Sequence, residues 1–261
     1  MTIPCYRIDA FTDRLFSGNP AAVCPLERWL PDGLMQSIAA ENNLSETAFF
    51  VPDEGAYALR WFTPVTEVAL CGHATLASAW VVLNELDPDA SAVSFTTQSG
   101  ELRVAREGDQ LVMDFPACPG EARPDPARLL EALGVEHAAC FKAMDWMVVL
   151  ASESDVRDLR PNMPGLLEID ARGVIVTAPG DECDFVSRFF APGVGVPEDP
   201  VTGSAHCTLF PYWAKQLGRS ELRARQISAR GGEILGRVRG ERVDLVGGAR
   251  LFARGTLLID Q

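Results

Sequence analysis

The sequence predicts an α+β protein built from two similar halves, each with a helix that begins at a glycine. The main observation is an internal repeat: RWFTP at 60–64 leads to LCGHAT at 70–75, and RFFAP at 188–192 leads to VTGSAH at 201–206. The offset is 128 residues between the arginines and 131 between the glycines, so the second half has a three-residue insertion. A length of 261 residues also suits two domains of roughly 100 to 150 residues each.

Apolar periodicity, turn residues and helix-start signals predict the elements of the first half. In chain order these are a strand at 5–11, an apolar run at 21–24, a helix at 34–42, strands at 44–51 and 57–62, a helix from 72 to about 84, and strands at 93–97, 101–105 and 110–115. The segment 116–126 contains four prolines, which no helix or strand interior tolerates well, and is predicted to be a linker.

The second half is expected to repeat this order. Its elements are a helix at 127–133, a strand at 141–150, a short helix near 154–159, strands at 173–178 and 184–190, a helix at 203–217, strands at 226–229, 233–239 and 242–245, and a last strand at 251–259. We expect the last strand to pack on the first half. The predicted domains are therefore residues 1–115 with the C-terminal segment 251–261, and residues 116–250.

Charge and composition limit the class of partner. The net charge is −13 and the 23 basic residues form no stripe, so neither nucleic acid nor an anionic membrane is expected to bind. The N-terminus lacks a basic and apolar leader, and no run approaches about 20 apolar residues, which predicts a cytoplasmic protein without membrane spans. The seven cysteines include no C-x-x-C pair, so neither a metal site nor a disulfide framework is expected.

Three histidines are present, and His73 is the best candidate for chemistry because it follows the glycine that begins the first repeated helix. The alternative, that His73 only fills space at the helix start as a polar residue, is the weaker interpretation. His206 lies one turn into the second helix, where a core position or a dimer contact is as plausible as a role in a site. His137, beside alanines, is expected at the surface.

Glu46 is a carboxylate within the otherwise apolar and small run at 44–50. Desolvation against aromatic side chains is expected to raise the pKa of such a carboxyl toward the range useful for proton transfer. An exposed position on one face of an antiparallel sheet explains the pattern equally well.

Asp199 precedes the second repeated glycine in the motif EDPVTGS at 198–204, where an aspartate is often only a helix cap. Aligned without gaps from the two glycines, Asp199 corresponds to Val68, Thr202 to Cys71 and Ser204 to His73. The halves have thus diverged at the turns where a ligand would lie. Two helix N-termini, at Gly72 and Gly203, are expected to bind an anion at a site between the halves.

Taken together, the motifs resemble the PhzF-like (phenazine biosynthesis isomerase) family over nearly the whole chain. They are DAFT at 9–12, FSGNP at 16–20, SETAF at 45–49, RWFTP at 60–64, LCGHAT at 70–75 and EDPVTGSA at 198–205. The resemblance implies the diaminopimelate-epimerase-like fold, in which each of two pseudo-symmetric α+β domains wraps a curved, barrel-like sheet around a central helix.

The resemblance also implies a cofactor-independent isomerase that acts on a small carboxylate-bearing molecule and forms a homodimer. Glu46 would be the acid/base that shuttles the proton, with His73 and Asp199 as its catalytic partners. The residues implied in substrate binding are Gly18, Asn19, Cys71, Gly72, Thr202, Gly203 and Ser204. No metal and no cofactor is expected.

Two alternatives stay open. Epimerases of the same fold use two opposed cysteines, one at each glycine turn, but here Cys71 is matched by Thr202, whose hydroxyl is far less acidic than a thiol. Cys207 is expected to face the core. The other alternative is a protein that binds a small acid on this scaffold without catalysis, since fold alone does not define function.

Overall fold

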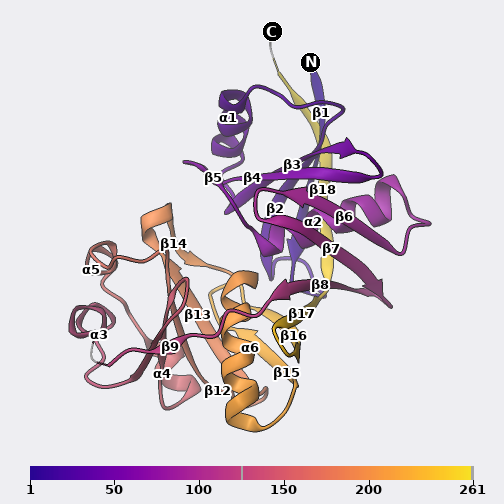
Figure 1. Cartoon of the computed structure of the whole chain (residues 1–261). Helices are drawn as coiled ribbons and strands as arrows, with labels where there is room; N and C mark the ends of the chain where they lie inside the picture. Colours follow the sequence, from indigo (N-terminus) through magenta and orange to yellow (C-terminus); the bar gives the residue numbers. More distant parts are fainter. Residues whose placement is uncertain (125, 260–261) are drawn as a thin grey trace. The chain divides into compact units, whose positions relative to one another are not determined.

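The computed structural model describes residues 1–124 and 126–259, which divide into two compact units (Figure 1). Unit 1 contains Met1–Asp114 and the segment that begins at Val246, and unit 2 contains Phe115–Leu245. The predicted return to the first half is five residues later, at 251. Asp125 of the predicted linker and residues 260 and 261 of the predicted C-terminal segment lie outside the described residues. The assignment of residues 1–115 with 251–261 and of residues 116–250 to two domains stays a prediction.

Unit 1 is organised around a mixed sheet. Its strands are β1 (Thr2–Ala10), β2 (Asn19–Pro25), β3 (Glu46–Asp53), β4 (Ala56–Phe62), β5 (Glu67–Val68), β6 (Ala92–Thr97), β7 (Gly100–Glu107), β8 (Gln110–Pro116) and β18 (Ala249–Leu258). β1 pairs antiparallel with both β18 and β2, β2 is parallel to β3, and β3 is antiparallel to β4. β4 pairs with β5 and, in parallel, with β6, from which β7 and β8 continue as antiparallel neighbours.

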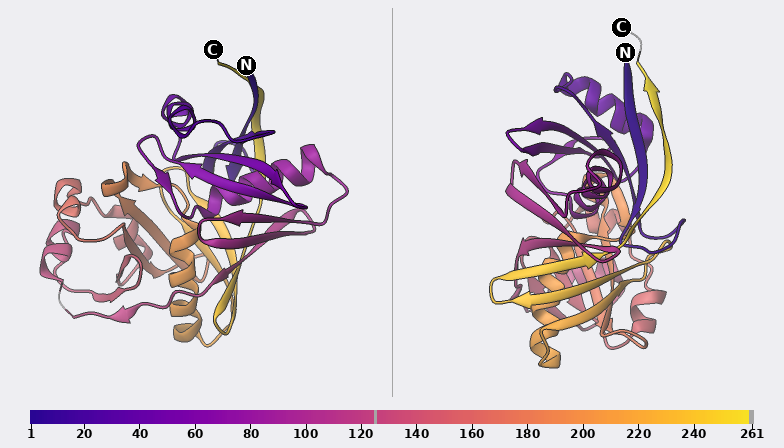
Figure 2. Two further views of the ribbon diagram at one scale, coloured as in Figure 1. Left: turned by 45° about the horizontal axis from the view of Figure 1, so that its top comes forward. Right: turned by 90° about the vertical axis from the view of Figure 1, so that its right-hand side faces the viewer.

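The central helix of unit 1 is α2 (Gly72–Val81), which continues as one π-helical turn at Val82–Leu86. Every residue of α2 except Trp80 is buried, as expected for a helix that is apolar on all sides. It packs against β1, β2 and β3, and the strands of unit 1 lie on more than one side of it (Figure 2). A second helix, α1 (Asp32–Asn42), covers β3.

Unit 2 repeats this plan. Its strands are β9 (Glu121–Ala122), β10 (Ala139–Lys142), β11 (Trp146–Val149), β12 (Val174–Pro179), β13 (Phe185–Ala191), β14 (Val196–Asp199), β15 (Glu221–Gln226), β16 (Gly232–Arg239) and β17 (Arg242–Gly247). Its helices are α3 (Ala127–Leu133), α4 (Glu153–Asp158), α5 (Met163–Leu167) and α6 (Gly203–Leu217), with a 3₁₀ turn at Pro192–Val194. The helix α6 packs on β15 and β16, and Trp213 stacks on Phe185 of β13 with ring centroids 5.6 Å apart.

The internal repeat is visible in the strand pairing. In unit 1, β2 is parallel to β3, β3 is antiparallel to β4, and β4 is parallel to β6. In unit 2, β11 is parallel to β12, β12 is antiparallel to β13, and β13 is parallel to β15. Arg60 donates two hydrogen bonds to Glu67, at 2.7 and 2.8 Å, and Arg188 donates two to Glu198, at 2.7 and 2.9 Å. The three-residue insertion lies between Arg188 and Glu198, where the chain forms the 3₁₀ turn.

The two arginines predict unequal stability effects. Arg188 also donates to the backbone carbonyls of Val156 and Leu159 at the end of α4, whereas Arg60 makes its remaining ion pair with the exposed Asp32. A lysine cannot reproduce a two-bond fork to a carboxylate. We expect Arg188→Lys to lower the free energy of unfolding by about 2 kcal/mol and Arg60→Lys by about 1 kcal/mol. Urea denaturation of both variants measures this, and an equal or reversed effect would contradict the expectation.

Several predicted elements differ from the structure. The expected single strand at 141–150 is the hairpin β10–β11, because residues 143–145 form a turn in which Ala143 N donates to Asp145 O. The expected linker contains β9, which pairs with β10. The strand expected at 226–229 is β15, which ends at Gln226, and α5 was not expected. In contrast, the helices at 127–133 and 203–217 are correct to the residue.

No helix within the two described ranges has both the length and the apolar character that crossing a membrane requires.

Candidate functional site

Glu46 and His73 lie together in unit 1. Glu46 is the first residue of β3 and His73 is the second residue of α2, so a strand end and a helix start present them to each other. Oε2 of Glu46 is 3.1 Å from Nε2 of His73, and their side chains are 15% and 4% exposed. The exposed-strand interpretation of Glu46 is therefore wrong, and the expected pairing of these residues in one site is supported by their contact.

Two further side chains approach the other ring nitrogen of His73. Asn19, the first residue of β2, places Nδ2 3.1 Å from Nδ1, and the Sγ atom of Cys71 lies 3.5 Å from the same nitrogen. Cys71 is the N-cap of α2, and Gly72 is the first residue of that helix. Burial lowers the pKa of His73 to about 3, so the imidazole is neutral near pH 7. A neutral ring can accept or pass on a proton without first losing one.

Gly18 makes the turn that leads into Asn19. Its φ is +67°, a conformation that favours glycine, and a Cβ added there would lie 2.2 Å from the backbone oxygen of Ala10. Asp9 accepts a hydrogen bond from the backbone N–H of Phe16 at 3.0 Å, which closes the same loop. The position of the Asn19 amide beside His73 thus depends on a glycine at position 18.

In unit 2, Asp199 and Thr202 form a second polar cluster before α6. Thr202 is the N-cap residue, and its Oγ1 donates to Oδ2 of Asp199 at 2.5 Å. Gln226 at the end of β15 holds both: its Oε1 accepts from Thr202 N at 2.9 Å and its Nε2 donates to Asp199 O at 2.6 Å. Asp199 is therefore not a simple helix cap.

Ser204, the second residue of α6, is held by an ion pair that the sequence analysis did not include. Arg172 donates from Nη2 to Ser204 Oγ at 3.0 Å, and Nε and Nη2 of the same guanidinium donate to Asp145 at 2.9 and 2.5 Å. The Asp145 side chain is only 2% exposed. The missed residues Asp145, Arg172 and Gln226 come from two loops and a strand end without a repeated motif. The only sequence signal was an arginine directly before the apolar strand at 173–178.

The two halves bring opposite charges to corresponding helix starts. Thr47 pairs with Phe62, and Val174 pairs with Phe190, which occupies the position of Phe62 in the repeat. The counterpart of Glu46 in unit 2 is therefore Gly173, and its neighbour Arg172 extends to Ser204, the counterpart of His73. Unit 1 thus presents a carboxylate at its central helix, and unit 2 presents a guanidinium.

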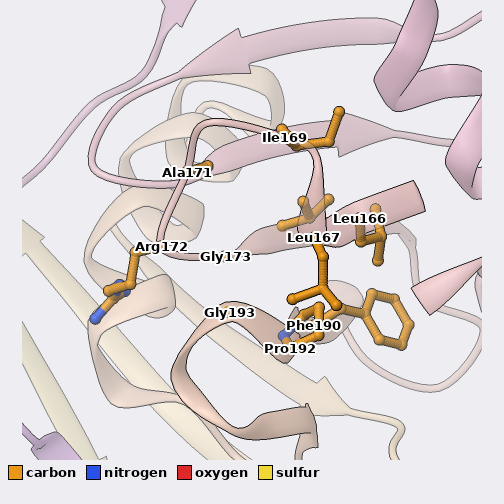
Figure 3. A pocket seen from close by; sticks show the side chains of 10 residues that line it. Leu166, Leu167, Ile169, Ala171, Arg172, Gly173, Phe190, Pro192 and Gly193 are labelled. Carbon is orange, nitrogen blue, oxygen red and sulfur yellow. The ribbon is translucent and has the colours of Figure 1, made fainter. Parts of the chain in front are cut away.

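A small cavity of unit 2 lies beside Arg172 and is lined mainly by apolar side chains (Figure 3). Leu166, Leu167, Phe190 and Pro192 contribute to it, while the Arg172 side chain extends away from them (Figure 3). The volume that the centre of a water molecule can occupy inside this cavity is about 20 Å³. That is sufficient for about one ordered water and too little for an organic substrate.

His206 and Cys207 are core residues of α6. His206 is fully buried against Phe185 and Phe210, and its Nδ1 lies 2.8 Å from the carbonyl oxygen of Thr202, one turn earlier. Burial lowers the pKa of His206 to about 4 and raises the pKa of the Cys207 thiol to about 12. The expectation that Cys207 faces the core is confirmed, and its thiol is a poor base at neutral pH. His137 is exposed, as predicted.

The buried His206 predicts a pH dependence of stability. Its pKa in the folded protein, about 4, is below the value of about 6.5 in an unfolded chain. The stability of the folded protein that depends on a neutral His206 is therefore complete above pH 6.5 and is lost as the pH falls toward 4. This residue alone should make the protein less stable at pH 5 than at pH 7 by about 2 kcal/mol. Urea denaturation at both pH values should show a smaller difference for His206→Gln than for the unsubstituted protein. His137→Gln is the control, and equal pH dependence in all three proteins would contradict the prediction.

The comparisons with known proteins agree with this architecture. A probable proline racemase from Agrobacterium radiobacter has a similar structure, with a TM-score of 0.68 over 99% of this chain and 93% of its own, and at 10% identity it shows the fold alone. The two units therefore have the racemase and epimerase fold that includes diaminopimelate epimerase, each with a curved sheet around a central helix.

The family assignment is more specific. The sequence profile described as "Phenazine biosynthesis-like protein" (PhzC-PhzF) matches residues 8–255. An uncharacterized isomerase of Pseudomonas aeruginosa is 54% identical over 98% of this chain and 99% of its own length. The crystal structure of a PhzF family protein from Enterococcus faecalis is 46% identical and superposes with a TM-score of 0.95, covering 99% of this chain and all of that one. The chain belongs to the PhzC-PhzF, phenazine biosynthesis-like family.

Proposed function

We propose that this protein is a cofactor-independent isomerase that moves a proton, and with it a double bond, on a small carboxylate-bearing substrate. The observation that carries the proposal is the contact of Glu46 with His73 at 3.1 Å, at the start of a buried helix. The isomerase name of the relative with 54% identity supports the reaction class.

In the proposed mechanism, Glu46 removes a proton from one carbon of the substrate and returns it to another, so the carboxylate is regenerated. The neutral His73 imidazole lies 3.1 Å from the carboxylate, within reach for a proton to pass between the two groups. Asn19 and Cys71 hold the ring from its Nδ1 side. Gly18 and Gly72 are proposed to shape the site through the backbone: Gly18 forms the turn that positions Asn19, and Gly72 is the first residue of α2.

Unit 2 is proposed to bind the substrate's polar groups. Ser204 Oγ accepts from Arg172, so its own hydroxyl hydrogen is available to a substrate oxygen. The first N–H groups of α6, at Gly203 and Ser204, are further donors for a carboxylate. Asp199 is proposed to orient a polar substrate group, with Thr202 and Gln226 fixing the carboxylate.

Incorporation of deuterium from D₂O into candidate substrates tests the reaction class. A panel of unsaturated and amino-substituted small carboxylic acids, followed by proton NMR, should reveal a compound that exchanges a carbon-bound proton only with the enzyme. Saturable binding of several such acids with no exchange would instead favour the binding-protein alternative.

The two-cysteine epimerase is disfavoured by a specific contact. Thr202 occupies the place of the second cysteine, and its hydroxyl is already used as a donor to Asp199. We therefore expect Cys71→Ser to retain proton exchange within about tenfold of the unsubstituted protein, because general acid/base catalysis by Glu46 is intact. The exchange rate in D₂O measures this. A rate near zero in Cys71→Ser together with normal exchange in Glu46→Gln would favour thiol chemistry.

We further propose a homodimer, mainly on the family resemblance. Light scattering at micromolar concentration checks the mass, and a monomer mass would count against the dimer.

A further inference from the structure

Three side chains with metal-ligating atoms gather at the start of α2. One ligand atom from each of Glu46, Cys71 and His73 lies within 4.8 Å of the other two. No metal site is expected from the sequence, because its seven cysteines include no C-x-x-C pair. We propose that Glu46, Cys71 and His73 form a binding site for Zn²⁺ or a similar thiophilic divalent ion.

The distances suit a tetrahedral ion. Zinc binds imidazole nitrogen and carboxylate oxygen at about 2.0 to 2.2 Å, which places two such ligands about 3.3 Å apart. Oε2 of Glu46 is 3.1 Å from Nε2 of His73, close to that separation. Nε2 is the ring nitrogen that faces the Glu46 carboxylate, and a shift of the ring proton to Nδ1 gives it the lone pair that a metal requires. The Cys71 sulfur, which lies 3.5 Å from Nδ1 of the same ring, becomes the third ligand by a rearrangement of its side chain toward Nε2.

The charges of the ligands also match a divalent cation. A thiolate from Cys71 and the carboxylate of Glu46 together neutralise the two positive charges of the ion. Cys71 is the N-cap of α2, a position at which the helix dipole stabilises a thiolate. With three protein ligands, the fourth position remains open to water or to a small anion.

Asn19 supplies the supporting contact that a metal-bound histidine requires. When Nε2 of His73 binds an ion, the ring proton lies on Nδ1 and needs an acceptor. The Asn19 amide lies 3.1 Å from Nδ1, and a 180° flip of this amide presents Oδ1 in place of Nδ2. The residue already in contact with the ring is thus able to fix the tautomer of the metal-bound form.

Metal binding has a consequence for activity that rests on the proposed function. An ion held by Glu46 and His73 occupies the lone pairs that would accept the substrate proton. Zn²⁺ is therefore an inhibitor of the isomerase that competes with proton transfer, and it is not its cofactor. Binding itself is measured without any substrate, so its outcome is independent of the proposed reaction.

Titration of the metal-free full-length protein with Co²⁺, which replaces Zn²⁺ in such sites, tests the proposal. We expect saturation at one ion per chain, with a sulfur-to-cobalt charge-transfer absorption and the visible bands of a tetrahedral ion. Added Zn²⁺ should displace the cobalt and remove both signals. Cys71→Ser should abolish the charge-transfer absorption and weaken Zn²⁺ binding, measured by calorimetry, by more than about 100-fold, the upper range for loss of a supporting residue.

Cys118→Ser is the matched control, because Cys118 is a half-buried thiol of unit 2 outside the cluster, and it should bind Co²⁺ with unchanged spectra. Glu46→Gln tests the ligand set separately: it should retain the charge-transfer absorption with at least tenfold weaker binding. Absence of saturable binding, or charge-transfer absorption that persists in Cys71→Ser, would overturn the proposal. Circular dichroism of each variant shows whether a loss of binding is merely a loss of fold.

Discussion

Glu46→Gln is expected to lower the rate of solvent-deuterium incorporation into a true substrate by about 10³-fold, within the range for loss of a general acid/base. The amide keeps the size and shape of the side chain but cannot accept a proton from carbon. Because Glu46 begins β3 beside His73, the substitution changes the charge at this point without removing any packed atoms. Binding of the substrate should therefore change much less than its turnover.

Proton NMR in D₂O at saturating substrate measures the exchange, and the concentration dependence gives the binding. Glu41→Gln is the matched control, since Glu41 is an exposed glutamate of α1, and it should exchange at the unsubstituted rate. Full exchange by Glu46→Gln would contradict the glutamate mechanism.

Gly18→Ala is expected to cost about 3 to 5 kcal/mol of the free energy of unfolding, which is a large part of the roughly 5 to 15 kcal/mol typical of a folded protein. Two causes act together. The φ of +67° is unfavourable for alanine, and its Cβ would lie 2.2 Å from the oxygen of Ala10, a backbone atom that cannot move alone. Because Asn19 is the next residue, the remaining folded protein should also lose the contact of that amide with His73.

Urea denaturation measures the loss in stability, and Gly33→Ala is the control. Gly33 lies in α1 with nothing within 4 Å of an added Cβ, so alanine there should be neutral or stabilising by up to about 1 kcal/mol. Gly55→Ala separates the two causes, because Gly55 has a φ of +88° and open space around it. If Gly18→Ala and Gly55→Ala cost the same, the close approach to Ala10 contributes nothing.

The repeat explains why much of the fold was predictable. The repeated arginines and glycines define the same strand, hairpin and helix in each half. The strand pairing follows this alignment to single residues: Trp61 pairs with Val68 in unit 1, and Phe189 pairs with Asp199 in unit 2. Glu46 and His73 were predictable because each breaks a local pattern: a carboxylate in an apolar run, and an imidazole at a helix start.

The residues that escaped prediction act over long sequence separations. Arg172 reaches Ser204 across 32 residues, and Gln226 reaches Thr202 across 24. A single sequence records no distance between such positions, and each of these polar residues is unremarkable in its own loop or strand. The hairpin at β10 and β11 escaped for a different reason, because the turn at 143–145 contains neither glycine nor proline.

The return of the chain to its starting strand affects the order in which the protein is completed during synthesis. β18 pairs with β1 along nearly its whole length, and the amino group of Met1 donates to the carbonyl oxygen of Ile259 at 2.6 Å. Unit 2 is continuous in sequence, so all its residues have been translated before β18 is made. The strands of unit 1 that precede unit 2 in the sequence are made before it, and β18, which completes unit 1, is made after it. One edge of β1 therefore stays without its partner strand throughout the translation of unit 2, and this is the interval in which nascent chains are most exposed to pairing with one another.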